Sequence, residues 1–422
     1  MLRYNEMRQT RKQKLKPALI KFFFLTLMIL KAQTLNANEE AYQGYIEFFE
    51  KVYQTMSENY FQSVPREAFD HFLEEFKTKI YSQLNETGKS IDYIRWRSAN
   101  IMVEKLKDPD DIFSTFYPPK PAKEYEETVL GVRVDLGIEG TLVPQGYQTT
   151  QVEPRSDAYE KGLRIGDVLL TIGGKKTTKM KEDAIKELLN PLIDSKVKLT
   201  YMDRDENKVK KIEVISKEYF KQTVFLEPTK APGVFCFKIA RFNRKTSEDL
   251  MVHLNFVKQQ GPINGLILDL RGNPGGPPLA AREISSFFLP GGEEFTYFQK
   301  RDQPKFSLDV PVIPDQYKYS GPLVILVDEN SGSSAELFSG ILQRKGRAVL
   351  IGKNTAGQVF LKSMFHFDDE SMLVLVTARG HHPDGEVFSF QGVTPDRVLT
   401  EEEKTIDLIE YASVYLVYAA KK

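Results

Sequence analysis

Two short segments place small and polar residues where a buried strand should give way to a helix. The first runs from Asn330 to Glu336, reads Asn-Ser-Gly-Ser-Ser-Ala-Glu, and directly follows the apolar run 323–327. A serine at such a turn presents its hydroxyl beside helix N-terminal N–H groups, and those donors can stabilise a developing oxyanion. The same residue types also form ordinary helix N-caps, so this segment alone does not define a nucleophile.

The second segment, Asp269 to Gly276, reads Asp-Leu-Arg-Gly-Asn-Pro-Gly-Gly and also ends an apolar run that leads toward a helix. Glycine-rich backbone can approach a ligand closely and direct its N–H groups toward it. The alternative interpretation is an ordinary tight loop. The length of the second segment favours a functional loop over a chance match.

The elements that must position these segments alternate between strand and helix. Short apolar runs predict buried strands at 234–239, 265–270, 323–327 and 348–351, and apolar residues at helical spacing predict helices at 247–260, 279–288 and 335–343. Buried strands separated by helices are typical of an α/β core. We therefore expect both segments to lie on one such core.

Two regions of different character precede this core. Residues 40–106 carry aromatic residues at three- and four-residue spacing, which predicts amphipathic helices. Residues 124–219 alternate short β-branched runs, such as Val129 to Val134, with glycines, and hold one helical segment from Lys181 to Leu189. That pattern predicts a compact β-rich module. The fold class expected is therefore multidomain α/β, closed by a helix over 401–419.

Composition limits the partners and the compartment. Lys and Arg together number 58, as do Asp and Glu, and this zero net charge gives no support for a nucleic-acid partner. The single cysteine, Cys236, excludes an intrachain disulfide. A basic stretch, the apolar run 22–30 and Leu35-Asn36-Ala37 have the layout of a secretory signal peptide cut after Ala37.

Taken in order, these motifs resemble those of the carboxyl-terminal processing, or tail-specific, serine peptidases. The resemblance extends over roughly residues 40–420. Its motifs are Asp111–Phe116, Asp269–Gly276, Ser333-Ser334-Ala335-Glu336, Gly346–Val349, Gly352–Gly357 and Gln391–Asp396. Within the β-rich module, Ala158–Leu169 resembles the signature of a PDZ domain, and Val129-Leu130-Gly131-Val132 is similar to its carboxylate-binding loop.

The resemblance implies a serine–lysine dyad supported by a glutamine, a variant of nucleophile plus general base. It places the nucleophile at Ser333 and the oxyanion donors at Ser334, Gly275 and Gly276. It also places the general-base lysine at position 358 and the glutamine at 362, but the sequence has Gln358 and Lys362. The two residue types are present and exchanged.

Three interpretations of the exchanged pair remain open. In the first, the stretch 359–367 forms a strand with positions 358 and 362 on one face about 13 Å apart, and the exchanged lysine places an amine near the serine. In the second interpretation the dyad is lost and the fold survives as a binding scaffold. In the third, the base is Lys353 or one of His366, His381 and His382.

The resemblance therefore implies an exported serine endopeptidase that captures protein C-termini through its PDZ domain. The alternative is a catalytically inactive pseudopeptidase that acts as a PDZ-based peptide-binding or adaptor protein. We expect periplasmic or secreted localisation, substrates with free C-termini, a homo-oligomer, an adaptor of unspecified identity as a further partner, and neither metal nor cofactor. The predicted parts are a signal peptide at 1–37, helices at 38–122, PDZ at 123–219, peptidase core at 220–400 and a C-terminal helix at 401–422.

Overall fold

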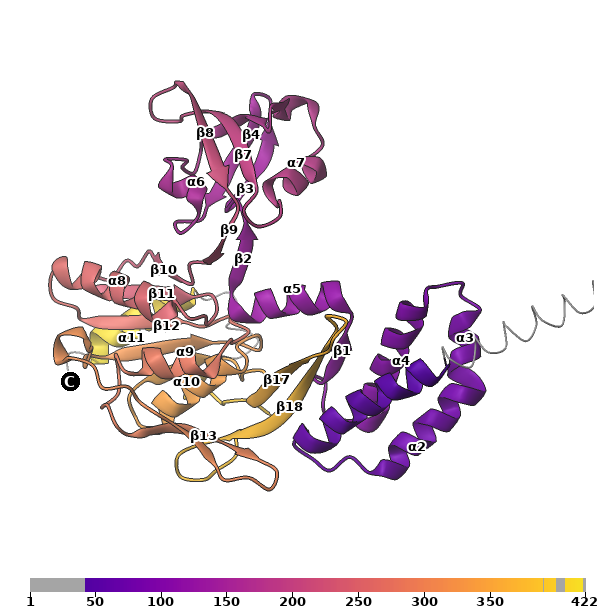
Figure 1. Ribbon diagram of the computed structural model, residues 1–422. Helices are drawn as coiled ribbons and strands as arrows, with labels where there is room; N and C mark the ends of the chain where they lie inside the picture. Colours follow the sequence, from indigo (N-terminus) through magenta and orange to yellow (C-terminus); the bar gives the residue numbers. More distant parts are fainter. Residues whose placement is uncertain (1–41, 390, 400–406, 420–422) are drawn as a thin grey trace, which may run out of the picture. The chain divides into compact units, whose positions relative to one another are not determined.

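The computed structural model describes residues 42–389, 391–399 and 407–419, which form two compact units (Figure 1). One unit holds the described residues up to Pro119 together with Lys362–Val376, and the other holds Lys120–Leu361 together with the described residues from Thr377 onward. The predicted signal peptide at 1–37 lies outside the described residues. In the ranges described, none of the helices has both the length and the apolar character needed to cross a membrane.

The first unit is mainly helical. Its helices are 42–59, α2 (Arg66–Glu75), α3 (Tyr81–Asn85) and α4 (Ile91–Leu106), with one π-helical turn, Phe76–Ile80, between α2 and α3. The predicted aromatic stripes are buried as expected: Phe49, Phe69, Phe72 and Phe76 are at most 1% exposed. Phe49 and Phe76 meet edge to face at 4.8 Å between ring centroids, which is a favourable aromatic geometry.

This unit also contains a short antiparallel pairing. Strand β1 (Thr115–Tyr117) pairs with the first half of β18 (Met372–His381), so that Thr115 stands opposite Val374. The buried Asp111 fixes the turn before β1, because its carboxylate accepts hydrogen bonds from the N–H groups of Phe113 and Ser114. Strand β17 (Phe360–His366) also pairs with β18.

The second unit begins with the β-rich module. A five-strand path runs in the order β3-β4-β5-β7-β8, β6 pairs with β5, and β2 pairs with β9. The bounds are β2 Val132–Asp135, β3 Ile138–Val143, β4 Gly146–Val152, α6 Asp157–Glu160, β5 Val168–Ile172, β6 Lys175–Lys176, α7 Glu182–Leu189, β7 Lys196–Met202, β8 Val209–Ile215 and β9 Lys217–Phe220. The core of the module includes Leu169, Ile172, Ile185 and Leu199, each at most 1% exposed.

The predicted strand Val129–Val134 is wrong over its first residues. Helix α5 (Pro119–Leu130) continues through Leu130, and the strand begins only at Val132. Gly131 separates them with φ +68°, the left-handed conformation that commonly terminates a helix. β-Branched composition predicted the strand, but the glycine after Leu130 marked the helix end.

The core of the second unit is a six-stranded sheet in the order β10-β11-β12-β15-β16-β19, parallel from β11 onward. Its strands are β10 Val224–Glu227, β11 Val234–Ile239, β12 Gly265–Asp269, β15 Leu323–Val327, β16 Val349–Gly352 and β19 Arg397–Val398. Its helices are α8 Thr246–Gln259, α9 Pro278–Ser285, α10 Ser334–Arg344 and α11 Leu408–Ala419. A separate antiparallel pairing joins β13 (Glu294–Lys300) to β14 (Phe306–Asp309) and to the second half of β18.

Helices cover both faces of this sheet. Leu266 and Leu268 of β12 pack in one cluster with α8, α9 and α10, whereas Ile267 packs in another with α11. Burial on both faces explains why β12 reads as an unbroken apolar run rather than an alternating one. The multidomain α/β class is confirmed. Because β12 and β15 are parallel neighbours, the two candidate segments, which follow them, emerge at the same edge of the sheet.

Candidate active site

Ser333 stands at the N-terminus of α10 in an unusual backbone conformation. Its φ is +52° and its ψ is −115°, a combination that L-residues rarely adopt. Such a conformation costs on the order of 1–3 kcal/mol and persists only where surrounding contacts impose it. The strain falls on the predicted nucleophile, and its neighbours explain how it is held.

Glu336 is the group that imposes this turn. Its side chain is fully buried, and its Oε2 accepts hydrogen bonds from the N–H of Ser333 and the N–H of Gln358, both at 2.8 Å. Its Oε1 accepts from the N–H of Gly357 and the hydroxyl of Thr355, both at 2.6 Å. Burial raises the pKa of this carboxyl, while the four donors oppose that shift. One carboxylate therefore ties the serine turn to the loop that precedes β17.

Sequence reasoning assigned no role to Glu336. The available signal was its spacing, since a serine followed three residues later by glutamate is the pattern of a capping box. The three further donors come from residues 355–358, which lie about twenty positions away along the chain. That part of the network could not be read from local spacing.

The glycine-rich loop packs directly against the serine turn. A Cβ on Gly275 would lie 2.7 Å from Ser333 Cβ, and one on Gly276 would lie 2.0 Å from Phe242 O. Their φ values are +96° and +148°, so both position and conformation demand glycine. Ser334, 1% exposed, donates its hydroxyl hydrogen bond to Gly276 O at 2.6 Å. The structure thus brings the predicted nucleophile and the predicted donor residues together.

The predicted oxyanion donors differ in their availability. The Gly275 N–H already donates to Asn273 Oδ1 at 2.8 Å. Asn273 is fully buried and bridges the loop, because its Nδ2 donates to Ile239 O and its own carbonyl accepts from Gly332 N–H. Gly275 therefore acts through close packing, and the oxyanion prediction rests on Ser334 and Gly276.

Gln358 lies beside the serine turn. Its Oε1 is 3.5 Å from the position that a Cβ on Gly332 would occupy. It precedes β17 instead of standing in it, and its carbonyl accepts a hydrogen bond from Phe360 N–H at 3.0 Å. The expectation that positions 358 and 362 share one face of a strand is therefore wrong, because the chain turns between Gln358 and the strand.

Lys362 belongs to the first unit, where its ammonium lies 4.8 Å from the centroid of the Phe113 ring. Burial lowers the pKa of this lysine, and the nearby Asp111 carboxylate opposes the shift. A lysine acts as a general base only in its neutral form, and a lowered pKa makes that form more abundant at neutral pH. The proposed role as a base requires a buried lysine, and the sequence alone does not show whether Lys362 is buried.

The other candidate bases have structural partners of their own. Lys353 pairs with Glu329 at 3.0 Å, and His381 stacks on Tyr297 with ring centroids 4.6 Å apart. His382 is 9% exposed and stacks on Phe388, and burial lowers its pKa to about 4. His366 is exposed at the end of β17.

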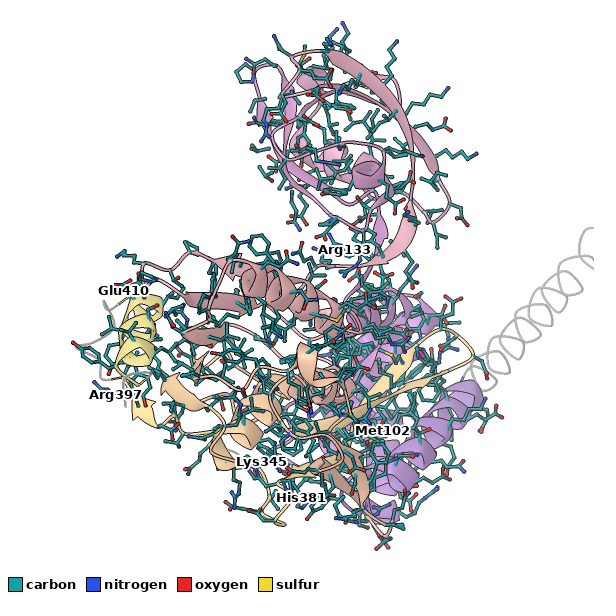
Figure 2. All side chains as sticks on the ribbon, turned by 90° about the vertical axis from the view of Figure 1, so that its left-hand side faces the viewer. Met102, Arg133, Lys345, His381, Arg397 and Glu410 are labelled. Carbon is teal, nitrogen blue, oxygen red and sulfur yellow. The ribbon has the colours of Figure 1, made fainter. Side chains whose placement is uncertain are left out.

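The β-rich module has a hollow of about 370 Å³ between β3 and α7. Strand β3 is the edge of its sheet, and Ile138 and Gly140 line the hollow from that side while Lys186 lines it from α7. Arg133, visible near the base of the module in Figure 2, also lines it. An edge strand beside a helix can receive an extended peptide as an additional strand.

The residues predicted to bind a terminal carboxylate do not line this hollow. Val129 and Leu130 end α5, and a Cβ on Gly131 would lie 2.6 Å from Asn243 Cβ in the core. Val132 pairs with Phe220. A direct role for Val129–Val132 in peptide binding thus stays a prediction, and β3 is the strand that the hollow exposes.

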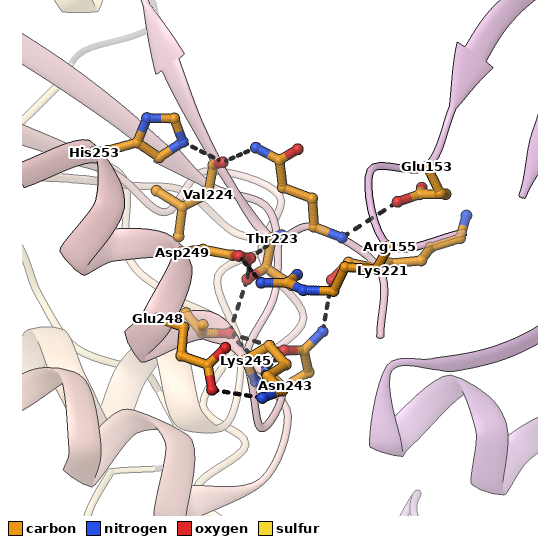
Figure 3. A network of polar contacts seen from close by, with 12 residues as sticks. Glu153, Arg155, Lys221, Thr223, Val224, Asn243, Lys245, Glu248, Asp249 and His253 are labelled. Atoms are coloured by element: carbon orange, nitrogen blue, oxygen red, sulfur yellow. Dashed lines mark hydrogen bonds and ion pairs between the residues drawn. The ribbon is translucent and has the colours of Figure 1, made fainter. Parts of the chain in front are cut away.

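A polar network joins the module to the core of the second unit (Figure 3). Arg155 pairs with Asp249 of α8 at 2.6 Å, and the other oxygen of Asp249 accepts from Thr223 N–H at 2.8 Å. Asn243 Nδ2 donates to Lys221 O at 2.9 Å. Asp249 is only 6% exposed, so its carboxylate is largely shielded from water in this ion pair.

Comparisons with known proteins show which families the chain is similar to. A model of peptidase family S41 matches residues 234–399, and a PDZ domain model matches residues 122–202. The carboxyl-terminal-processing protease of Synechocystis sp. is 26% identical over 323 residues, which are 74% of this chain and 72% of that protein. The carboxy-terminal processing protease CtpA of Bacillus subtilis is 25% identical over 325 residues, 76% of this chain and 66% of that protein.

Among solved structures, a crystal structure of the tricorn protease is similar in fold. Its TM-score is 0.52 at 15% identity, over 90% of this chain and 37% of that chain. This chain spans about two thirds of the length of the two relatives named above.

Proposed function

Because the chain belongs to the carboxyl-terminal processing serine peptidases, with a peptidase family S41 core and an internal PDZ domain, we propose that it hydrolyses peptide bonds of polypeptides with free C-termini. The observation that carries the proposal is the strained turn at Ser333. Glu336 accepts a hydrogen bond from the Ser333 N–H, and Gly275 packs against the Ser333 side chain. A strained conformation imposed by buried contacts is typical of functional sites.

In the proposed reaction the Ser333 oxygen attacks the carbonyl carbon of the scissile bond while its proton passes to a neutral amine. The N–H groups of Ser334 and Gly276 would stabilise the resulting oxyanion. The carbon–nitrogen bond then breaks, the leaving amine takes the proton, and water hydrolyses the acyl-enzyme. Preorganised donors of this kind contribute about 3–4 kcal/mol to such reactions.

Lys362 is the proposed general base, on the pattern of the family with its lysine and glutamine exchanged. Its lowered pKa supports the role, because burial favours the neutral amine. Gln358, beside Gly332, would then take the supporting place of the glutamine. If this assignment is correct, activity should rise with pH as the lysine loses its proton.

Substrate capture is proposed at the hollow between β3 and α7. An extended C-terminal segment would pair with the free edge of β3, which supplies main-chain hydrogen bonds whatever the side chains of the substrate. Direct binding of the terminal carboxylate by Val129–Val132 stays a prediction from the sequence.

One observation favours the second candidate function, a pseudopeptidase that binds peptides without cleaving them. A glutamine, not a lysine, stands at position 358, where the family pattern places the base. In that case Ser333 would have no proton acceptor. Casein cleavage by the wild type and by Ser333→Ala discriminates between the candidates. Cleavage lost in the variant supports the peptidase, and equal inertness supports the scaffold.

The exchanged pair can be tested by restoring the family arrangement. In the scaffold interpretation, Gln358→Lys combined with Lys362→Gln should create activity, because the serine turn is already preorganised. In the peptidase interpretation, wild-type activity should disappear in Lys362→Ala as completely as in Ser333→Ala, because nucleophile and base act as a unit. Activity unaffected by Lys362→Ala would refute the proposed base.

Export and assembly are proposals from sequence. N-terminal sequencing of the periplasmic or secreted form should find residue 38 first, and an intact Met1 would contradict export. The exposed Val414, Tyr415 and Tyr418 of α11 support a homo-oligomer. Light scattering that gives the mass of one chain at micromolar concentration would contradict it.

A further inference from the structure

One cationic side chain next to the glycine-rich loop has no counter-charge among the residues that the structure describes. Arg241 follows β11, its Nε is buried without a hydrogen-bond partner, and no carboxylate of the described chain pairs with its guanidinium. A buried donor without a partner costs roughly 1–3 kcal/mol. Such groups are rare in native structures, and each calls for an explanation.

Neighbouring cations differ from Arg241 in this respect. Arg271 and Lys238 both pair with the buried Asp269, at 2.8 and 3.4 Å. Burial alone lowers the pKa of Arg241, without a nearby acid to offset it. An arginine remains charged even so, because its pKa is far above neutrality. The charge at Arg241 is therefore partly desolvated and uncompensated.

Two close contacts connect the backbone next to Arg241 with Ser333. The residue after Arg241, Phe242, donates its N–H to Gly275 O at 2.9 Å. A Cβ on Gly275 would in turn lie 2.7 Å from Ser333 Cβ. Consecutive Cα atoms are about 3.8 Å apart. The backbone of Arg241 is therefore close enough to the candidate active site for an arginine side chain to reach it.

We propose that Arg241 is a substrate-binding residue that pairs with a carboxylate of the polypeptide in the active site. A guanidinium matches a carboxylate in a two-point hydrogen-bonded arrangement. The carboxylate has two possible sources, the free C-terminus of the substrate and an aspartate or glutamate side chain. The proposal rests on the proposed peptidase function and adds a preference for acidic groups near the cleaved bond.

The first test locates the contact without requiring cleavage. Full-length Ser333→Ala protein is treated with phenylglyoxal, which modifies arginine, and the modification of Arg241 is followed by mass spectrometry. Three otherwise identical peptides compete: one with a free C-terminus and no acidic residue, one amidated without acidic residues, and one amidated with a single glutamate. Arg244, exposed on the same loop, is the internal control.

We expect a carboxylate-bearing peptide to slow modification of Arg241 about tenfold or more and to leave Arg244 unaffected. Protection by the free C-terminus alone, or by the glutamate alone, identifies the source, and protection by both shows that either is accepted. Equal protection by the amidated peptide without acid, or no protection by any peptide, overturns the proposal. Because this readout needs no catalysis, an inactive wild type would refute the peptidase function separately.

The second test uses the active enzyme. Arg241→Gln should raise KM for the protecting peptide roughly tenfold or more, the loss expected for one charge-assisted hydrogen bond, with kcat little changed. Its melting temperature should not fall, because none of the described residues forms a hydrogen bond or ion pair with the Arg241 guanidinium. Arg244→Gln should leave KM unchanged. An unaltered KM in Arg241→Gln would contradict the proposal.

Discussion

Replacing Glu336 by glutamine is the most informative single change at the serine turn. The shape of the side chain is kept, but one carboxylate oxygen becomes an NH2 group. In the best orientation the amide oxygen keeps the N–H groups of Ser333 and Gln358, and the NH2 faces Thr355 and Gly357. The threonine hydroxyl can accept from it, whereas the Gly357 N–H is left facing another donor.

The loss of stability in Glu336→Gln can be estimated from the hydrogen bonds that are kept and lost. The raised pKa of Glu336 indicates that burial disfavours the charge by more than its hydrogen bonds favour it, so removing the charge is not the main cost. The main cost is one buried N–H without an acceptor, about 1–3 kcal/mol. For a domain of this size that corresponds to a melting temperature lower by roughly 2–10 °C.

Activity should fall further than stability. If the turn relaxes by as little as ~1 Å, the serine is misplaced and the rate can drop about 100-fold. Calorimetry and peptide hydrolysis are measured on Glu336→Gln and on Glu248→Gln, a control whose exposed carboxylate pairs only at the surface. Loss of stability with full activity would refute the positioning role, and no change in either quantity would refute the whole network.

The remaining predictions concern the glycine loop, a buried histidine and the PDZ edge strand. Gly275→Ala should abolish activity and lower the melting temperature, because its Cβ would overlap Ser333 Cβ, whereas Gly272→Ala, also at positive φ but in open space, should cost only roughly 1–2 kcal/mol of backbone strain. His382, with its pKa lowered to about 4 by burial, should make the protein less stable as pH falls from about 6.5 to 4, by roughly 3 kcal/mol, because only the unfolded chain takes up the proton in that range. Denaturation at several pH values should show a flatter profile for His382→Gln, and an unchanged profile would contradict the assignment. Peptides with a free C-terminus should protect the amides of β3 from hydrogen exchange more than amidated peptides do. Protection of other amides without protection of β3 would show that the peptide does not bind in the hollow between β3 and α7.

The order and class of the elements could be predicted because each carries a local signal. The strand Val234–Ile239 was predicted with the bounds that the structure has, since an apolar run between turn residues is a strong indicator. At Leu130 the prediction failed because β-branched composition was weighed above the glycine that ends the helix. Local rules compete at such junctions, and the conformation of one residue decides between them.

The candidate site could likewise be predicted from the sequence only in part. Proximity of Ser333 to Gly275 and Gly276 could be anticipated, because parallel neighbouring strands bring the segments after them to one edge of the sheet. The roles of Glu336 and Asn273 could not, since each satisfies backbone donors that only the folded chain brings near. The geometry of Gln358 was also beyond reach, because a turn separates it from the strand that the sequence predicts.

Covalent labelling with a fluorophosphonate probe measures directly whether Ser333 is an activated nucleophile. The wild type, Ser333→Ala and Lys362→Ala are incubated with the probe, and each adduct is mapped by peptide mass spectrometry. We expect one adduct on Ser333 in the wild type, none in Ser333→Ala and a strongly slowed reaction in Lys362→Ala. A wild type that remains unlabelled, or that is labelled equally in Ser333→Ala, would contradict this expectation.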